Sequence, residues 1–260
     1  MDRAVNVCRL GFSHLVLFAE GSVSGFFVWG HRGASSQAPE NTMAAFHEAY
    51  EAGAGGVELD VHLSRDGVPV VIHDETLDRT TSGAGPVKNK TFSQIRALDA
   101  GGWFSSDYSG ERVPSLEDVL RWAQGRLRLN IEIKAADAGM AVLELLSRHP
   151  LAEVLLSSFN HHLLARLRRL APDLPMGFLV DGPFWHLALV RAVRHGGVSV
   201  HPRADRVSRT LVRACHSKGL HVIPWTVDEL ERIDFLRRLG VDGVFTNDPR
   251  KVLRHLDEPD

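Results

Sequence analysis

Two short acidic patterns in the sequence could together bind a metal ion. Glu58 and Asp60 are two residues apart near the end of an apolar run, and Glu132 and Lys134 have the same spacing in a second run. Residues two apart in a strand point to the same face, so each pair shares one face of its strand. Buried carboxylates are costly unless their charge is compensated. A buried salt bridge of Lys134 would explain one isolated pair, but two such strand ends together favour an oxygen-ligand site for a hard divalent cation.

Two histidines occur where acid–base chemistry would need them. His31 directly follows an apolar run in the string G-H-R-G (30–33), whose glycines permit close approach of a substrate. His73 ends another apolar run. Imidazoles titrate near neutral pH, so a pair of them can exchange the roles of acid and base. Arg32 can offer a bidentate fork to a phosphate oxygen, which makes it a candidate for substrate binding.

The elements that must position these residues follow an alternating pattern. From residue 26 onward, short apolar runs alternate with segments of helical period, a pattern typical of parallel βαβ units. Eight strands in a chain of 260 residues favour a (β/α)₈ barrel, which needs about 250 residues. The predicted strands are 26–29, 56–63, 129–134, 154–159, 176–180, 198–201, 221–227 and 243–246. We expect the active site at the carboxyl ends of these strands.

A ninth apolar run, 69–73, does not fit this count. It follows the second strand too closely for a parallel crossover, but Asp66-Gly67 is a typical hairpin signal. We therefore predict that the second strand extends into a β-ribbon that returns antiparallel. Pairing centred on Asp66-Gly67 gives partner numbers that sum to about 133, which places His73 opposite Asp60. The turn-rich segment of about 75–114 is predicted to be an insertion that covers the barrel mouth.

One aromatic side chain has two interpretations that the sequence leaves open. Trp225 lies in the seventh predicted strand, close to its carboxyl end. A tryptophan at this position either packs in the core or turns its ring toward a substrate. We treat it as a candidate substrate-binding residue.

The composition limits the domain organisation and the partners. With 44% apolar residues, the chain suits one compact domain, which we assign to 26–260, with 1–25 as an N-terminal extension. The net charge of -2 gives no reason to expect nucleic acid as a partner. No apolar run reaches the ~20 residues of a membrane span. Two cysteines far apart in sequence and no recognisable signal peptide favour a cytoplasmic location.

Taken in order, these motifs resemble the glycerophosphodiester phosphodiesterase family. Single pieces such as H-R-G are unspecific, but the ordered set is specific and spans residues 26 to about 253. The matching strings are WGHRG (29–33), PENT (39–42), VELDV (57–61), DG (66–67), PVVIHD (69–74), LDRTT (77–81), EIK (132–134), SSF (157–159), WTV (225–227) and GVFTNDP (243–249).

The resemblance implies an activity and a set of site residues. It implies hydrolysis of glycerophosphodiesters to sn-glycerol 3-phosphate and an alcohol, with one Mg²⁺ or Ca²⁺ and with the glycerol 2-hydroxyl as internal nucleophile. The implied residues are the metal ligands Glu58, Asp60 and Glu132, the catalytic histidines His31 and His73, and the phosphate contacts Arg32 and Lys134. One departure is His201, where many relatives have an asparagine, so the substrate contacts at that wall stay open.

Three alternative functions stand beside this one. A lysophospholipase D-type activity on lysophospholipids would need an apolar entrance, for which Trp103, Phe104, Phe184 and Trp185 are available. A non-catalytic phosphodiester-binding protein is the alternative from another class. Loss of a histidine or a carboxylate would indicate it, but all of these residues are present. A sugar-phosphate isomerase or aldolase would need a different catalytic set. The head group, the ion and the oligomeric state stay open.

Overall fold

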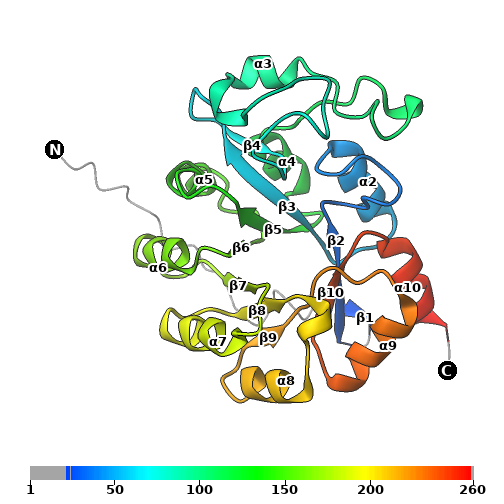
Figure 1. The fold of residues 1–260 in the computed structure, drawn as a ribbon, viewed down its shortest axis with the longest axis vertical. Helices are drawn as coiled ribbons and strands as arrows, with labels where there is room; N and C mark the ends of the chain where they lie inside the picture. Colours follow the sequence, from blue (N-terminus) through cyan, green and yellow to red (C-terminus); the bar gives the residue numbers. More distant parts are fainter. Residues whose placement is uncertain (1–21, 24, 259–260) are drawn as a thin grey trace.

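The computed structural model describes residues 22–23 and 25–258, and shows a barrel of eight parallel strands (Figure 1). Residues 1–21, most of the predicted extension, lie outside the described residues. The barrel strands are β2 (Phe26–His31), β3 (Gly56–Leu63), β5 (Arg128–Ile133), β6 (Val154–Ser158), β7 (Met176–Val180), β8 (Ser199–Pro202), β9 (His221–Val222) and β10 (Gly243–Thr246). They pair in this order, and β10 pairs with β2. A short β1 (Ser22–Val23) pairs antiparallel with β2. The predicted barrel is confirmed.

The last gap in the barrel is closed by backbone hydrogen bonds rather than by a regular ladder. The amide of Asp242 donates to the carbonyl of Val222 over 3.0 Å, and that of Phe245 donates to Pro224 over 2.9 Å. These bonds join the β9 segment to β10, so the strands form a nearly closed ring. A closed ring has no free sheet edge on which further chains could pair.

In the part of the chain that the structure describes, eight helices follow the barrel strands, and they surround the barrel (Figure 1). Thr42 caps the first of them by accepting from the amide of Ala45, and Ser115 and Asp248 cap two others in the same way. Among the described residues, no helix combines the length and the apolar character needed to cross a bilayer. The helices are α2 (Met43–Glu51), α4 (Leu116–Ala123), α5 (Ala138–Ser147), α6 (His161–Leu170), α7 (Trp185–Arg194), α8 (Arg209–His216), α9 (Leu230–Leu239) and α10 (Pro249–Asp257).

The alternation of side chains along β2 determines where His31 points. Phe27 and Trp29 pack with Phe245 in an apolar cluster enclosed by the strands. His31, two residues further on, continues the same face at the carboxyl end of the strand. Gly56 on the neighbouring strand is required here, because a Cβ at that position would lie 2.4 Å from the indole of Trp29. These rings fill the barrel interior below His31, so packed side chains form the bottom of the site.

The ribbon after β3 has a register that differs by one residue from the prediction. β4 (Pro69–Val71) pairs antiparallel with β3, and Val61 lies opposite Val71, so partner numbers sum to 132. The amide of Ser64 donates to the carbonyl of Val68, which leaves a three-residue loop that ends in Gly67 with φ +80. Such a loop is centred on one residue, whereas the prediction assumed a two-residue turn. The predicted pairing of His73 with Asp60 is therefore wrong by one position.

Residues 75–114 form a small unit with its own apolar cluster. It contains η1 (Val87–Asn89), α3 (Phe92–Arg96) and η2 (Ser106–Tyr108). Its buried side chains pack on the ribbon in a cluster separate from the main core. The unit lies beside the ribbon and α2 (Figure 1). In the described part of the chain it contributes nothing to the lining of the central pocket, so the expected cover over the mouth is not observed.

Candidate active site

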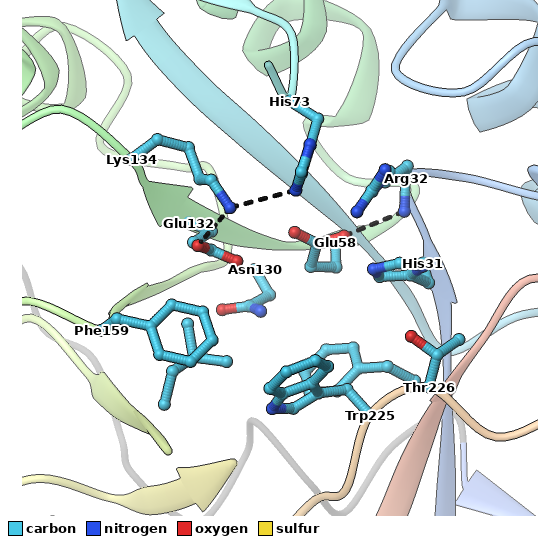
Figure 2. A pocket seen from close by; sticks show the side chains of 12 residues that line it. His31, Arg32, Glu58, His73, Asn130, Glu132, Lys134, Phe159, Trp225 and Thr226 are labelled. Atoms are coloured by element: carbon cyan, nitrogen blue, oxygen red, sulfur yellow. Dashed lines mark hydrogen bonds and ion pairs between the residues drawn. The ribbon is translucent and has the colours of Figure 1, made fainter. Parts of the chain in front are cut away.

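A pocket of about 190 Å³ opens at the carboxyl ends of the barrel strands (Figure 2). Its lining includes all of the sequence-predicted site residues except Asp60, whose exposed fraction is only 1%. Figure 2 shows a charged side with Lys134, His73 and Arg32 opposite an aromatic side. The lining residues are His31, Arg32, Glu58, His73, Asn130, Glu132, Lys134, Phe159, Leu179, Trp225, Thr226 and Phe245.

Three buried carboxylates meet at the charged side of this pocket. Glu58, Asp60 and Glu132 each offer one oxygen, and these oxygens all lie within 4.8 Å of one another. The strands bring them together because Asp60 on β3 lies opposite Glu132 on β5. Glu58 uses one oxygen to accept from the amide of Arg32 over 2.9 Å. Its other oxygen is buried without a hydrogen-bond partner.

The charges around the three carboxylates favour a cation between them. Burial, together with the charges of Asp60 and Glu132, raises the pKa of Glu58 well above its usual value. Burial and Asp60 likewise raise the pKa of Glu132 to about 7. Burial also opposes ionisation of Asp60, but the nearby charges of Arg32 and Lys134 outweigh it and lower its pKa. A divalent cation would bind the unpartnered oxygen and relieve the repulsion, so the residues present fit such an ion.

The salt bridge considered as the alternative for Lys134 is also present. The Nζ of Lys134 lies 2.9 Å from Oε1 of Glu132 and 3.5 Å from Oδ1 of Asp60. One ammonium group neutralises one negative charge, whereas the cluster holds three carboxylates. The two interpretations are therefore compatible, because an ion and Lys134 can share the same carboxylates.

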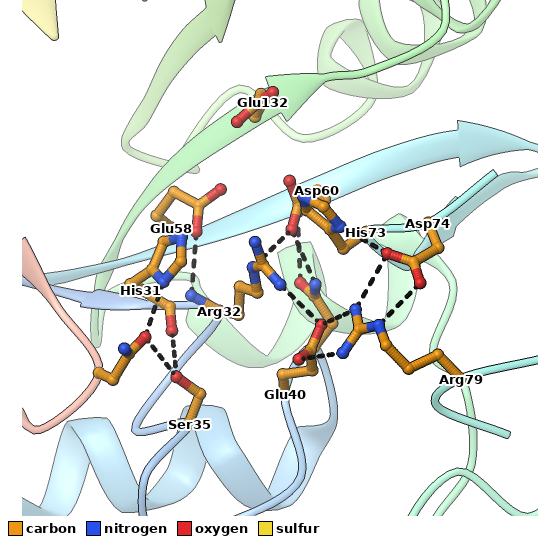
Figure 3. Close-up of polar contacts among 12 residues, drawn as sticks. His31, Arg32, Ser35, Glu40, Glu58, Asp60, His73, Asp74, Arg79 and Glu132 are labelled. Carbon is orange, nitrogen blue, oxygen red and sulfur yellow. Dashed lines mark hydrogen bonds and ion pairs between the residues drawn. The ribbon is translucent and has the colours of Figure 1, made fainter. Parts of the chain in front are cut away.

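A chain of hydrogen bonds fixes the protonation of His31. Its Nδ1 lies 2.7 Å from Oδ1 of Asn247, and Nδ2 of Asn247 donates to Asp228 over 2.7 Å (Figure 3 shows the contact of His31). Because the Asp228 carboxylate only accepts, the Asn247 amide must turn its oxygen toward His31. Nδ1 of His31 therefore carries the proton, and Nε2 is left as an acceptor. Burial, aided by the charge of Arg32, lowers the pKa of His31 to about 4, so the ring is neutral at pH 7.

His73 has an acidic neighbour instead of an amide. Its Nδ1 lies 2.7 Å from Oδ1 of Asp74, and its Nε2 lies 3.2 Å from Nζ of Lys134. Hydrogen bonds from Arg79, the largest cause, hold the pKa of Asp74 well below its usual range, so Asp74 is an anion. The ammonium of Lys134 can only donate, so Nε2 of His73 accepts in this contact and Nδ1 carries the proton toward Asp74. The two histidines thus differ in the partner of Nδ1, which is an amide oxygen for His31 and a carboxylate for His73.

Arg79 connects the carboxylate partner of His73 with the carboxylate partner of Arg32. Its guanidinium donates to both oxygens of Asp74 and to both oxygens of Glu40, over 2.7–3.0 Å (Figure 3). Glu40 also accepts from Arg32 over 2.9 Å. One guanidinium therefore holds the partner of His73 and the partner of Arg32. Sequence reasoning assigned no role to Arg79 or Asp74, although both lie in strings that match the family.

We expect Arg79→Met to lower kcat about 10–100-fold while changing KM little, because the variant loosens the partners of His73 and Arg32. Arg79→Lys should recover only part of the loss, since an ammonium cannot form two forks. Arg112→Met, an exposed change in the same segment, is the matched control. Steady-state kinetics of the three variants decide the point, and full activity of Arg79→Met would contradict the role assigned to it.

The other side of the pocket is aromatic. The rings of Trp225 and Phe159 meet edge to face with centroids 5.6 Å apart. The Nε1 of Trp225 donates to the carbonyl of His201, which leaves the face of the indole for the pocket. The ring of Trp225 lines the pocket and also packs against the apolar cluster of the barrel interior, so features of both interpretations are present. His201 itself is fully buried beside Ser199, and burial lowers its pKa to about 3, so it is a neutral core residue.

The fold and the site define a (β/α)₈-barrel protein with a polar, acid–base pocket at the carboxyl ends of its strands. The model of the glycerophosphoryl diester phosphodiesterase family matches residues 31–251, and the chain belongs to this family.

Relatives of known name and structure agree with this assignment. A glycerophosphodiester phosphodiesterase of Caldanaerobacter subterraneus subsp. tengcongensis is 40% identical over 233 residues, which cover 86% of this chain and 94% of the relative. One from Bacillus subtilis is 34% identical over 84% of this chain and 82% of its own length. A phosphodiesterase of Oleispira antarctica, solved with the product sn-glycerol-3-phosphate, superposes with a TM-score of 0.84 at 31% identity, covering 89% of this chain and 97% of its own.

Proposed function

We propose that this chain hydrolyses glycerophosphodiesters to sn-glycerol 3-phosphate and an alcohol. One observation carries the proposal: a single pocket has a charged side and an aromatic side. The charged side holds three carboxylates and two imidazoles whose Nδ1 atoms have different partners. The product bound by the Oleispira relative is the product that this division would suit. We expect the phosphoryl group beside Arg32 and Lys134, and the glycerol carbons against Phe159 and Trp225.

In the first step, the 2-hydroxyl of the glycerol attacks phosphorus. Nε2 of His31 accepts the hydroxyl proton, a new P–O bond forms, and the bond to the leaving alcohol breaks. For this step Nε2 of His73 carries a proton and points away from Lys134, and it gives that proton to the leaving oxygen. The products are a cyclic glycerophosphate and the free alcohol. An attack from within the substrate has a large proximity advantage over attack by free water.

In the second step, water opens the cyclic phosphate with the two roles exchanged. His73, now neutral, accepts a proton from the water, and His31 returns its proton to the 2-oxygen. The result is glycerol 3-phosphate, and both imidazoles regain their starting states. Arg32 and Lys134 stabilise the charge on the phosphoryl oxygens in both steps.

Glu58, Asp60 and Glu132 would hold the divalent cation, which we propose to be Mg²⁺ or Ca²⁺. When bound, the ion supplies positive charge for the phosphoryl oxygens. Oxygen-only ligands favour these two ions over softer metals, which prefer nitrogen or sulfur.

The direct test is the release of glycerol 3-phosphate from glycerophosphocholine, measured by a coupled enzyme assay. We expect turnover that EDTA abolishes and that excess Mg²⁺ or Ca²⁺ restores. Turnover that survives exhaustive chelation would contradict the metal requirement. No turnover of glycerophosphocholine, glycerophosphoethanolamine or glycerophosphoglycerol with either ion would contradict the activity.

A lysophospholipase D-type activity is the second candidate. It is favoured by large apolar side chains that stay exposed, of which Phe159 borders the pocket at 43% exposure and Phe184, which directly precedes α7, is 71% exposed. The same assay with lysophosphatidylcholine, followed by detection of free choline, separates the two substrates. A non-catalytic binding protein is the remaining alternative, and turnover of either substrate excludes it.

We further propose that residues 26–260 form the catalytic domain and that the protein acts in the cytoplasm. The family match begins at residue 31, and the barrel begins with β2. The two cysteines lie far apart in the sequence, which is typical of reduced residues in a reducing compartment.

A further inference from the structure

The outer face of α7 is apolar and lies exposed. Its inner face packs on the barrel through Ala188 and Ala192, which are buried. On the outer face, Leu187, Val190 and Val193 are 55%, 61% and 48% exposed. A surface helix is usually apolar only on the side that faces the core. Three large apolar side chains on the solvent side therefore indicate a contact with something outside the described chain.

The same region is strongly basic. Between Asn160 and Ala171, and again between Gly182 and Arg203, the sequence contains no acidic residue. The chain as a whole has a net charge of -2, so this concentration of positive charge is local. The basic side chains of the two helices are Arg166, Arg168, Arg169, Arg191 and Arg194.

The two sets of charges lie close together in space. Arg168 of α6 donates to the carbonyl of Gly196, just after α7, over 2.5 Å. In the other direction, Arg191 of α7 lies 3.4 Å from Nδ1 of His161 at the start of α6. His195 lies near the charges of both helices, since Arg194 and Arg169 add to burial in lowering its pKa. α6 and α7 therefore present one continuous basic and apolar surface.

We propose that this surface binds the face of an anionic lipid bilayer. We call it the α6–α7 face and define it by the exposed residues Arg166, Arg169, Leu187, Val190, Val193 and Arg194. Apolar side chains of this size enter the boundary between head groups and acyl chains, and the guanidinium groups bind the anionic head groups.

A second copy of the chain fits the α6–α7 face less well than a bilayer does. In a twofold dimer the same patch meets itself, so the three arginines of one face would meet the three of the other, with no acidic side chain on either helix. Nucleic acid would match the charge, but its phosphate backbone offers nothing to cover Leu187 and Val190. An anionic bilayer satisfies both the charge and the apolar side chains.

The helices of the α6–α7 face begin near the mouth of the pocket and run away from it along the side of the barrel. Phe184 directly precedes α7 and Phe159 lies just before α6, so both helices begin at the carboxyl ends of the strands. Phe159 also lines the pocket. A bilayer on the α6–α7 face would therefore lie along the side of the barrel. The binding itself does not depend on the proposed hydrolysis, and the two are tested separately.

The test is co-sedimentation of the full chain with vesicles. We expect binding to vesicles of equal parts phosphatidylcholine and phosphatidylglycerol, little binding to phosphatidylcholine alone, and weaker binding as salt is raised. Arg166→Glu combined with Arg194→Glu should lower the affinity at least ~30-fold. Leu187→Glu combined with Val190→Glu should abolish binding. Turnover of glycerophosphocholine, which is water-soluble, should stay unchanged in both variants.

The matched control is Arg238→Glu combined with Arg254→Glu, the same change of charge on α9 and α10, which lie on the other side of the barrel (Figure 1). This control should bind vesicles like the wild type. Equal losses in control and test variants would show that only net charge matters and would overturn the α6–α7 face as the site. A wild-type chain that ignores anionic vesicles, yet forms a dimer that Leu187→Glu with Val190→Glu dissociates in light scattering, would assign the face to a second copy.

Discussion

His73→Ala is expected to lose about 10²–10⁴-fold in kcat on glycerophosphocholine, but far less on a glycerophosphodiester whose leaving group is p-nitrophenol. The reason is the role assigned to Nε2 of His73, which protonates the leaving oxygen. A choline alkoxide needs that proton, whereas p-nitrophenolate departs without it. His31→Ala should lose as much on both substrates, because the 2-hydroxyl must be deprotonated in either case. Steady-state kinetics with the two substrates give the comparison.

The control for this experiment is His47→Ala, which removes an exposed imidazole on α2. It should leave both rates unchanged. If the activated leaving group rescues His31→Ala instead of His73→Ala, the two roles are reversed. If it rescues neither, the leaving-group proton does not come from either ring. The hydrogen bonds of Asn247 and Asp74 to the two histidines would then have a role other than preparing these rings for proton transfer.

Glu58→Gln is expected to abolish turnover and, at the same time, to stabilise the metal-free protein at high pH. The variant loses a ligand, but it also removes one charge from a buried, mutually repelling group. The amide side chain introduced by the substitution keeps an oxygen that can accept from the backbone amide of Arg32, as Glu58 does. Melting temperatures of the chelated proteins should therefore be higher for the variant at about pH 8.

The sign of the pH dependence follows from the raised pKa values. The pKa of Glu132 rises from 4.5 to about 7, and that of Glu58 also rises. Between pH 4.5 and about pH 7, the folded chain keeps carboxyl protons that the unfolded chain has released. The stability that comes from these protons is therefore fully present below about pH 4.5 and is lost as pH rises toward 7. The chelated wild type should thus melt lower at about pH 8 than the variant does, and Mg²⁺ should stabilise the wild type more there than at about pH 5.

Glu144→Gln serves as the control, because it removes an exposed carboxylate on α5. Its melting temperature should follow that of the wild type at every pH, with and without Mg²⁺. Thermal unfolding by circular dichroism is sufficient for the whole series. A chelated Glu58→Gln protein that melts below the wild type at about pH 8 would show that the carboxylates do not repel one another in solution.

The strands and most of the site could be predicted because both follow from periodicity. The alternation in β2 and β3 determines which side chains face inward, and parallel strands gather their carboxyl ends at one mouth. Glu58, Glu132 and His31 therefore meet in one pocket for reasons that are visible in the sequence. The hairpin register was wrong by one because Asp66-Gly67 is compatible with two loop lengths, and the bond from Ser64 to Val68 selects the longer.

The residues that set the state of the histidines could not be predicted in the same way. Asn247 lies 216 positions from His31 in sequence, and its role depends on the direction in which Asp228 turns its amide. Arg79 is a surface arginine with no periodic context, and only the folded chain places it between two carboxylates. Likewise, the segment 75–114 has enough apolar residues for its own cluster, so it packs there instead of covering the mouth.

The hydrogen bond from His31 to Asn247 joins the first barrel strand to the residue that follows the last one. During synthesis, every other part of the pocket leaves the ribosome before the acceptor for His31 does. The proton on Nδ1 of His31 is fixed by its acceptor only after β10 has paired with β2, and that pairing also completes the ring. Closure of the barrel and the orientation of His31 are therefore one event, so a chain that ends before Asn247 would carry every proposed catalytic group and still lack the contact that orients its proposed base.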